Sequence, residues 1–160
     1  MPTHYQGNEE ERRALDAYIK LARAAESTGQ RINGHLHAHG LTVSQFGVLE
    51  ALYHLGPMPV GQLAGKILRS SANLTLVVDN LAKHGLVTRE RRSDDRRCVE
   101  IRLTEQGQAL IAGMLPDHVA GVEAAFAALS AHEQEMLAAL CRKLGLAQED
   151  KTAAVGENLR

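Results

Sequence analysis

Cysteine and aromatic residues are scarce in this chain, and their scarcity excludes several classes of protein. Only two cysteines, Cys98 and Cys141, occur among 160 residues, so a disulfide framework is excluded and a reducing, intracellular setting is expected. Aromatic residues make up 3% of the chain, whereas alanine and leucine are abundant. This composition is typical of helices packed on helices.

Signals for export, membrane insertion and catalysis are also missing. Residues 1–5 lack the basic and then apolar pattern of a signal peptide, and no apolar run approaches membrane-spanning length. The sequence has no glycine-rich phosphate loop, nucleophile elbow or metal-hydrolase helix. We therefore expect one cytoplasmic domain, residues 1–160, that is not an enzyme and binds neither a cofactor nor a membrane.

The formal net charge of −1 conceals a basic segment. Residues 60–103 carry nine lysines and arginines against five acidic residues, so this segment has a charge of +4 and the remainder of the chain −5. A basic module within an acidic frame is typical of a protein that contacts phosphate groups through one surface.

The basic segment has the pattern of a winged helix-turn-helix, which we predict over residues 60–104. Two short helices, a break between them and a hairpin with an arginine-rich tip follow one another as Gly61–Leu68, Ser70–Ser71, Ala72–His84, Leu86–Arg92 and Cys98–Leu103. In this fold the second helix enters the major groove of DNA, and a basic wing reaches the DNA backbone or minor groove. The alternative is a solvated hairpin that is merely rich in arginine.

Local signals predict where the flanking helices begin. Thr42 with Gln45, and Ser130 with Glu133, form capping boxes in which side chains bond to the otherwise unpaired amides of a helix start. Thr104 is placed to cap a third helix directly after the wing.

Other signals predict where helices end. A long helix is expected over 9–39, with Gly40 placed to end it. Pro116 is expected to kink or break the helix after the wing, because proline lacks an amide and clashes with the preceding turn. The last helix is expected to end near residue 146, followed by a flexible tail over 147–160.

These elements predict a mainly α fold with a small β-wing, in which terminal helices flank the winged module. The helices over 9–39 and 105–146 carry more apolar positions than that module needs to cover itself. We therefore expect them to pair with a second copy as dimerisation helices. The alternative is a monomer with a self-sufficient core.

The helix over 72–84 has a predicted core face and a predicted DNA face. Residues spaced for the core are Leu74, Val77, Val78 and Leu81. Candidate base readers near the start of this helix are Asn73, Thr75 and Leu76, and Asn80 further along is a further candidate for contact with DNA. Ser70 and Ser71 are candidates for phosphate binding or for simple helix capping, and Arg92, Arg96 and Arg97 are candidates for contact with DNA from the wing.

Over residues 9–146 the chain resembles the MarR family of bacterial transcription regulators. The run Asp94-Asp95-Arg96 to Leu103-Thr104-Glu105-Gln106-Gly107, following Gly85-Leu86-Val87, is similar to the wing signature of that family. Residues 71–81 are similar to its recognition helix. Leu41-Thr42-x-x-Gln45-Phe46 and Pro116-x-His118 resemble the MhqR-like branch associated with quinone and catechol stress.

The resemblance implies a function and a set of partners. It implies a homodimer that binds a palindromic operator in double-stranded DNA, as a repressor that is released by a small phenolic or quinone-like ligand. It also implies that Asp94 orients a wing arginine, a role that agrees with the repulsion between a carboxylate and phosphate. Candidate residues for the ligand cleft are Tyr18, Tyr53, His54 and His118.

A regulator of the same fold that senses a metal ion or the redox state, instead of an aromatic ligand, is also an open alternative. His35 and His39 lie one α-helical turn apart and are candidates for a shared metal, although no third or fourth ligand can be placed from sequence. Cys98 is a candidate for redox sensing on a wing strand, whereas Cys141 is expected to be a small buried hydrophobe. A more distant alternative is a winged module that binds protein instead of DNA.

Overall fold

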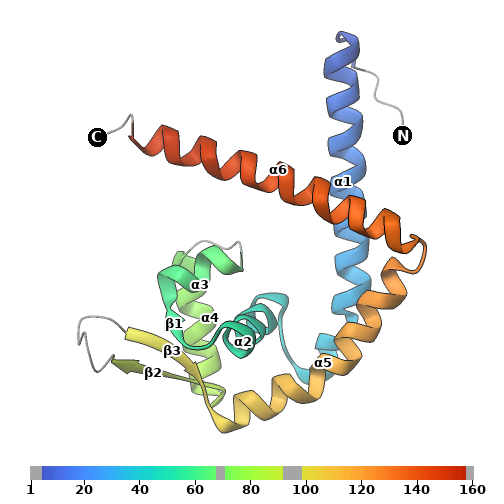
Figure 1. Ribbon diagram of the computed structural model, residues 1–160. Coiled ribbons are helices and arrows are strands. Elements are labelled where there is room, and N and C mark those ends of the chain that lie inside the picture. Colours follow the sequence, from blue (N-terminus) through green and yellow to red (C-terminus); the bar gives the residue numbers. More distant parts are fainter. Residues whose placement is uncertain (1–4, 68–70, 92–98, 158–160) are drawn as a thin grey trace. The chain divides into compact units, whose positions relative to one another are not determined.

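The computed structural model describes the backbone of residues 5–67, 71–91 and 99–157, and the side chains of residues 5–67, 73–91 and 99–147. The chain forms two compact units, residues 1–121 and 122–160, which we describe one at a time. In chain order the elements are α1 (Glu9–Asn33), the 3-10 helix η1 (Gly34–His39), α2 (Val43–Leu55), β1 (Met58–Pro59), α3 (Val60–Lys66), α4 (Ser71–Lys83), β2 (Val87–Arg91), β3 (Val99–Leu103), α5 (Glu105–Phe126) and α6 (Ala131–Glu157) (Figure 1).

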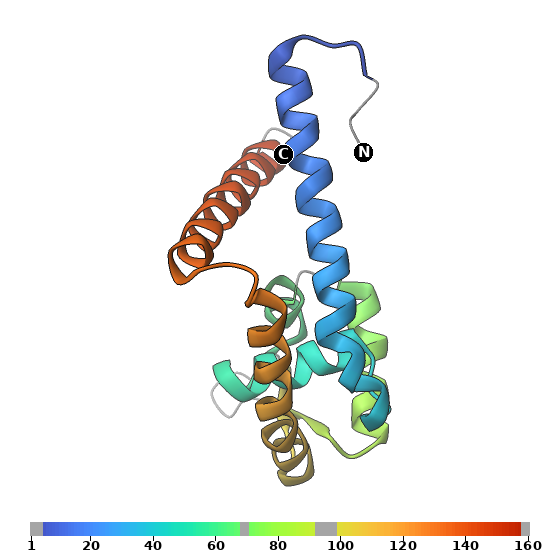
Figure 2. The same cartoon turned by 90° about the vertical axis from the view of Figure 1, so that its right-hand side faces the viewer.

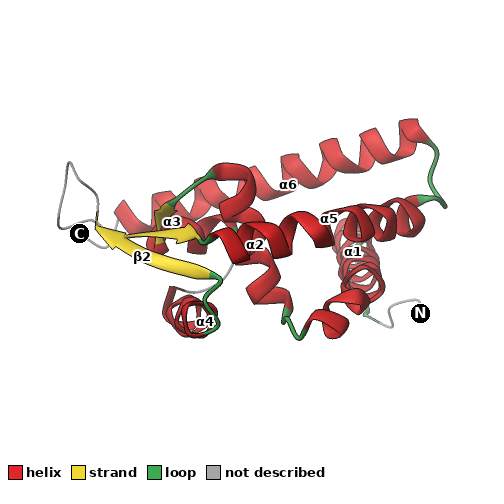
Figure 3. Ribbon diagram, turned by 90° about the horizontal axis from the view of Figure 1, so that it is seen from below, coloured by secondary structure: helices red, strands yellow, loops and turns green. Residues whose placement is uncertain are grey.

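A three-stranded antiparallel sheet and helices α2, α3 and α4 form the centre of the first unit (Figures 1 and 3). The strand order is β1-β3-β2, with Met58 opposite Ile101 and Arg89 opposite the same residue on the other side. Helix, helix and hairpin thus follow one another as predicted. The mainly α fold with a small β-wing is confirmed.

The core lies between α2, α4 and the sheet. It is built from Leu49, Leu63, Leu74, Val78 and Ile101, each no more than 1% exposed. The predicted core face of the helix over 72–84 is confirmed, since Leu74, Val78 and Leu81 are buried and Val77 packs against them. Burying each of these side chains stabilises the fold by roughly 1.5–3 kcal/mol.

Helix α1 projects away from this core for most of its length, and the structure buries none of its residues (Figure 2). The expected single helix over 9–39 ends earlier, because the chain tightens into η1 at Gly34. Gly40 then ends η1 in the left-handed conformation, with a φ of 64°, as predicted. The early end agrees with the weak helix propensity of glycine.

Helix α5 begins where the wing ends, and Thr104 joins the two. Its hydroxyl accepts a hydrogen bond from the amide of Gly107 at 3.0 Å and donates to the carbonyl of Gly85 at 2.6 Å. The predicted cap is therefore confirmed. The same hydroxyl ties the start of α5 to the turn before β2.

Helix α5 differs from the prediction in one respect. It continues without a break through Pro116, because only one amide is lost and packing of Ile111 and Met114 in the core holds the helix. By length and mean hydropathy alone it could also span a membrane, although Asp117 and Glu123 interrupt its apolar residues, so the prediction that the sequence has no long apolar run still holds. Its leucine, isoleucine, valine and alanine residues account for the hydropathy, and Gly107, Ile111 and Met114 are buried in the core of the first unit.

The second unit contains the end of α5 and the helix α6. Ser130 and Glu133 form the predicted capping box, and the hydrogen bonds from Ser130 lower the pKa of the Glu133 carboxyl. The helix continues to Glu157, beyond the expected end near residue 146, because its alanine-rich polar end still favours a helix. Cys141 is exposed in the single chain, which corrects the expectation that it is buried there.

Candidate nucleic-acid interface

Helix α4 carries the residues predicted to read DNA on the face opposite the core. Asn73 and Thr75 are exposed, and Leu76 is 73% exposed. A leucine side chain at this position can contact the methyl group of thymine in the major groove. The predicted base readers are thus accessible at the start of the helix.

Asn80 lies on α4 too, but it is half-buried and bonded to α2. The side-chain nitrogen of Gln45 donates to Oδ1 of Asn80 at 2.5 Å. Gln45 is also the third residue of the α2 helix and completes its capping box. Its side-chain Oε1 accepts from the backbone amide of Thr42 at 2.8 Å, and its backbone amide donates to the Thr42 hydroxyl. The capping box was predicted from the sequence, but the bond from Gln45 to the second helix was not.

An ion pair holds α4 from the other side. Nη2 of Arg89 on β2 lies 2.6 Å from Oδ1 of Asp79, and each side chain is about 40% exposed. Figure 3 shows α4 beside β2, the arrangement that makes this contact possible. The pair ties the recognition helix to the base of the wing, and no local pattern in the sequence indicates it.

The described part of the wing is polar and braced across its strands. Arg102 on β3 lies 3.1 Å from Glu90 on β2, an exposed pair that contributes little to stability. The remaining predicted DNA contacts, Ser70, Arg92, Asp94, Arg96 and Arg97, lie outside the described residues, as do Cys98 and the side chain of Ser71. Their roles stay predictions.

His118 belongs to a cluster of rings formed by η1, α2 and α5. Its ring centroid lies 4.6 Å from that of Phe46 and 5.2 Å from that of His35. Burial lowers the pKa of the His118 ring from its ordinary value of 6.5, the Glu50 carboxylate opposes this shift, and His35 adds a smaller lowering. Burial therefore favours the uncharged form of the His118 ring.

Two nitrogen atoms in this ring cluster are buried without a hydrogen-bond partner in the described part of the chain. They are Nε2 of His35 and Nδ1 of His118. Nδ1 of His35 donates to the carbonyl of Ile32 at 2.7 Å, since a carbonyl can only accept. Buried polar atoms that lack partners are unfavourable, so each of these nitrogens leaves a hydrogen-bonding capacity unused within the cluster.

The structure does not support the pairing of His35 and His39 as metal ligands. His35 and His39 lie in the 3-10 helix η1, where a turn takes three residues, so positions four apart do not share a face as they do in an α-helix. Among the described residues, no group of three or more histidine, cysteine, aspartate or glutamate side chains is placed to hold a metal ion.

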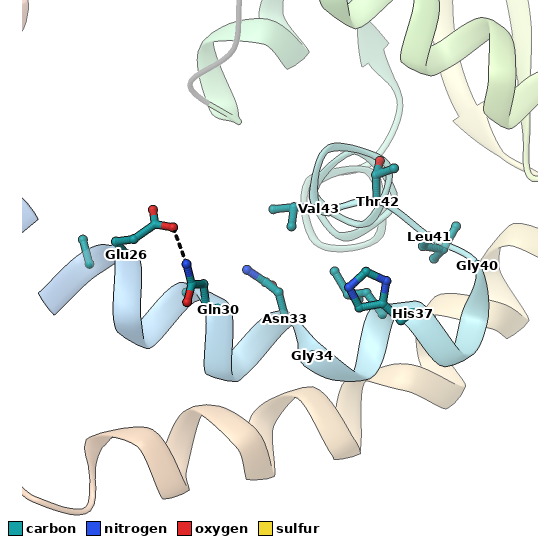
Figure 4. Close-up of a pocket in the computed structure, with 12 residues that line it drawn as sticks. Glu26, Gln30, Asn33, Gly34, His37, Gly40, Leu41, Thr42 and Val43 are labelled. Atoms are coloured by element: carbon teal, nitrogen blue, oxygen red, sulfur yellow. Dashed lines mark hydrogen bonds between the residues drawn. The ribbon is translucent and has the colours of Figure 1, made fainter. Parts of the chain in front are cut away.

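One pocket of the first unit is an open groove of about 830 Å³ beside α1, η1 and the start of α2. Leu36, Leu41 and Val43 form apolar parts of its lining, and Figure 4 shows Glu26 bonded to Gln30 at its edge. Its size is within the range of small-molecule sites.

The four residues predicted for the ligand cleft are not brought together. Tyr18 is exposed on α1. Tyr53 and His54 of α2 line two different pockets, although their ring centroids lie 5.2 Å apart. Only His118 lies in the ring cluster, whose other members, His35 and Phe46, were not predicted for this role.

Comparison with known proteins gives one consistent result. Residues 41–99 match the profile of the MarR family. The chain is 38% identical to the transcriptional regulator MhqR of Bacillus subtilis, over 84% of this chain and 92% of the relative. Its fold is similar to that of AbsC, a MarR family regulator from Streptomyces coelicolor, with a TM-score of 0.79 and 22% identity over 92% of this chain and 99% of the other. It is also similar to Bordetella bronchiseptica BpsR, whose DNA binding is regulated by 6-hydroxynicotinic acid, with a TM-score of 0.73 and 24% identity over 91% and 98%.

Proposed function

This chain belongs to the MarR family of DNA-binding transcriptional regulators, which are not enzymes, and we propose that it is a repressor that binds a palindromic operator as a homodimer. The observation that carries the proposal is the division of α4 into a buried face and an accessible one. Leu74 and Val78 fix the helix to the core, whereas Asn73, Thr75 and Leu76 are exposed near its start. The same proposal places the protein in the cytoplasm, where bacterial DNA is found.

The exposed apolar residues of the terminal helices support a dimer. Helix α1 has an apolar stripe but buries no residue within the single chain. Large apolar side chains exposed on α1, α5 and α6 are Tyr18, Leu21, Val119, Met136, Leu140, Leu144 and Leu146. A second copy that covers these helices would remove this surface from water and place two α4 helices at two half-sites of one operator.

We expect Asn73→Ala to lower affinity for the cognate duplex by about 1–3 kcal/mol, because an asparagine amide can pair with a base edge. The cognate duplex is one that the parent protein selects from random sequence, and binding is measured by fluorescence anisotropy. A random duplex of the same length is the control, on which the loss is expected to be small. Equal losses on both duplexes would contradict base reading by Asn73.

We further propose that the effector is a small hydroxylated aromatic compound that binds at the ring cluster. Support comes from the nitrogens of His35 and His118, which lack hydrogen-bond partners in the described part of the chain beside the buried Phe46 ring, so a ligand that pairs with them must open this cluster. A phenol supplies both a ring and a hydroxyl group to such a site. An effector that binds the DNA-free form more tightly lowers operator affinity by that difference in binding free energy.

The effector proposal is tested by titrating the protein–operator complex with catechol and with hydroquinone. We expect release in the parent, and a concentration for half-release at least about tenfold higher in His118→Phe, which keeps a ring but loses the nitrogen. Each variant is compared at equal operator saturation. If neither compound releases the parent from DNA, the proposed ligand class is wrong, whereas equal release of parent and variant places the ligand elsewhere.

A further inference from the structure

We propose that Gln45 is a positioning residue of the DNA interface, which sets the rotation of α4 about its axis through its bond to Asn80. The inference rests on the proposed role of α4 as the helix that reads the operator. Gln45 itself lies on α2, and neither the sequence pattern nor the comparisons assign it a part in DNA binding. Its side chain is half-buried between the two helices.

The capping box determines which end of the Gln45 amide meets α4. Oε1 of Gln45 accepts from the backbone amide of Thr42, a group that can only donate. The amide nitrogen of Gln45 therefore points toward Asn80, and Asn80 must present its oxygen in return. One set of hydrogen bonds thus runs from the start of α2 to the recognition helix, with each amide held in a single orientation.

Asn80 and its neighbour Asp79 are each held to a different element that packs against α4. Asn80 is bonded to α2, and Asp79 is paired with Arg89 of β2. The two side chains leave the helix about 100° apart, since each residue advances an α-helix by that angle. A small rotation of α4 in either direction lengthens one of these contacts, so together they oppose rolling of the helix.

Packing of the core alone leaves this rotation less well defined. The buried face of α4 is aliphatic, with Leu74, Val78 and Leu81. Burial of apolar surface is not directional, whereas a hydrogen bond weakens steeply as its angle changes. Base readers such as Asn73 must reach the groove with hydrogen-bond accuracy. The Gln45–Asn80 bond is therefore suited to control discrimination between DNA sequences.

The test compares Gln45→Met with Thr42→Ala, a pair matched in the capping box. Each variant loses one of the two reciprocal capping bonds, but only Gln45→Met loses the bond to Asn80. The readout is the ratio of affinities for the selected cognate duplex and a random duplex, with thermal unfolding measured in parallel. We expect both variants to unfold at a lower temperature, and only Gln45→Met to lose about tenfold in the ratio, the loss expected for one net hydrogen bond.

Two further variants test whether the effect passes through Asn80. In an Asn80→Ala background, which breaks the same bond with the capping box intact, Gln45→Met is expected to cause no additional loss. Gln45→Glu is expected to keep the ratio, because its carboxylate can accept from Thr42 and from a turned Asn80 amide. Its added charge weakens binding to both duplexes alike and cancels in the ratio.

The positioning role would be overturned by any of the following results. They are an unchanged ratio in Gln45→Met, an equal loss in Thr42→Ala, and a further loss from Gln45→Met when Asn80 is already alanine. A loss in Gln45→Glu as large as in Gln45→Met would also contradict it. A parent protein that does not distinguish the selected duplex from random DNA would instead refute the proposed function of α4.

Discussion

Gly107→Ala is expected to lower the free energy of unfolding by about 3 kcal/mol, the upper part of the range for overpacking a core. A Cβ atom at this position would lie 2.0 Å from the carbonyl oxygen of Leu86 and 3.3 Å from the Leu103 side chain. The carbonyl cannot move away easily, because it accepts a hydrogen bond from the amide of Thr104. The substitution therefore forces α5 away from the base of the wing, and urea unfolding measures the cost.

Gly113→Ala is the matched control in the same helix. Apart from the adjacent residues and the backbone of α5 itself, no atom of the described residues lies within 4 Å of a Cβ built at Gly113, so alanine adds helix propensity without a clash. We expect this variant to gain about 0.5–1 kcal/mol, the opposite sign. If Gly107→Ala and Gly113→Ala behaved alike, the close approach of α5 to Leu86 would not control stability.

The sequence predicted those parts of the fold that depend on neighbours three or four residues apart. The capping boxes at Thr42 and Ser130, the cap at Thr104 and the end at Gly40 are all of this kind. The core face of α4 followed from helical periodicity alone. Local signals fix these features because both partners lie within one turn of each other.

Contacts between distant residues could not be predicted in this way. Gln45 and Asn80 are 35 residues apart, and their bond depends on how α2 packs against α4. The same holds for Arg89 and Asp79, which meet only because β2 lies beside α4. The sequence thus identified the helix that faces DNA, but not the residues that hold it in place.

The histidines illustrate a different limit. His35 and His39 were paired as metal candidates on the assumption of a continuous α-helix, but the chain narrows to a 3-10 helix at Gly34. The histidine ring that packs against His35 is instead that of His118, which lies in α5, far along the sequence. Periodicity predicts neighbours only while the helix type stays constant.

Leu140→Glu is expected to dissociate the dimer and to abolish tight operator binding. Leu140 is 65% exposed in the single chain, on a stripe of α6 that it shares with Met136. In a two-fold dimer the substitution occurs twice, so a loss of about 2 kcal/mol per buried leucine amounts to about 4 kcal/mol and raises the dissociation constant of the dimer about a thousandfold.

Sedimentation of the Leu140→Glu variant at micromolar concentration tests this expectation, and Ala138→Glu is the matched control. Ala138 is also exposed on α6, but it lies about half a turn around the helix from Leu140, so the same charge is added on the opposite face. We expect the control to remain dimeric and to bind the operator as the parent does. Each Leu140→Glu monomer would contact a single half-site, and since two linked half-sites bind about 10²–10⁴-fold more tightly than one, operator affinity falls steeply although α4 is unaltered. A Leu140→Glu protein that stays dimeric under these conditions would place the dimer interface away from this face of α6.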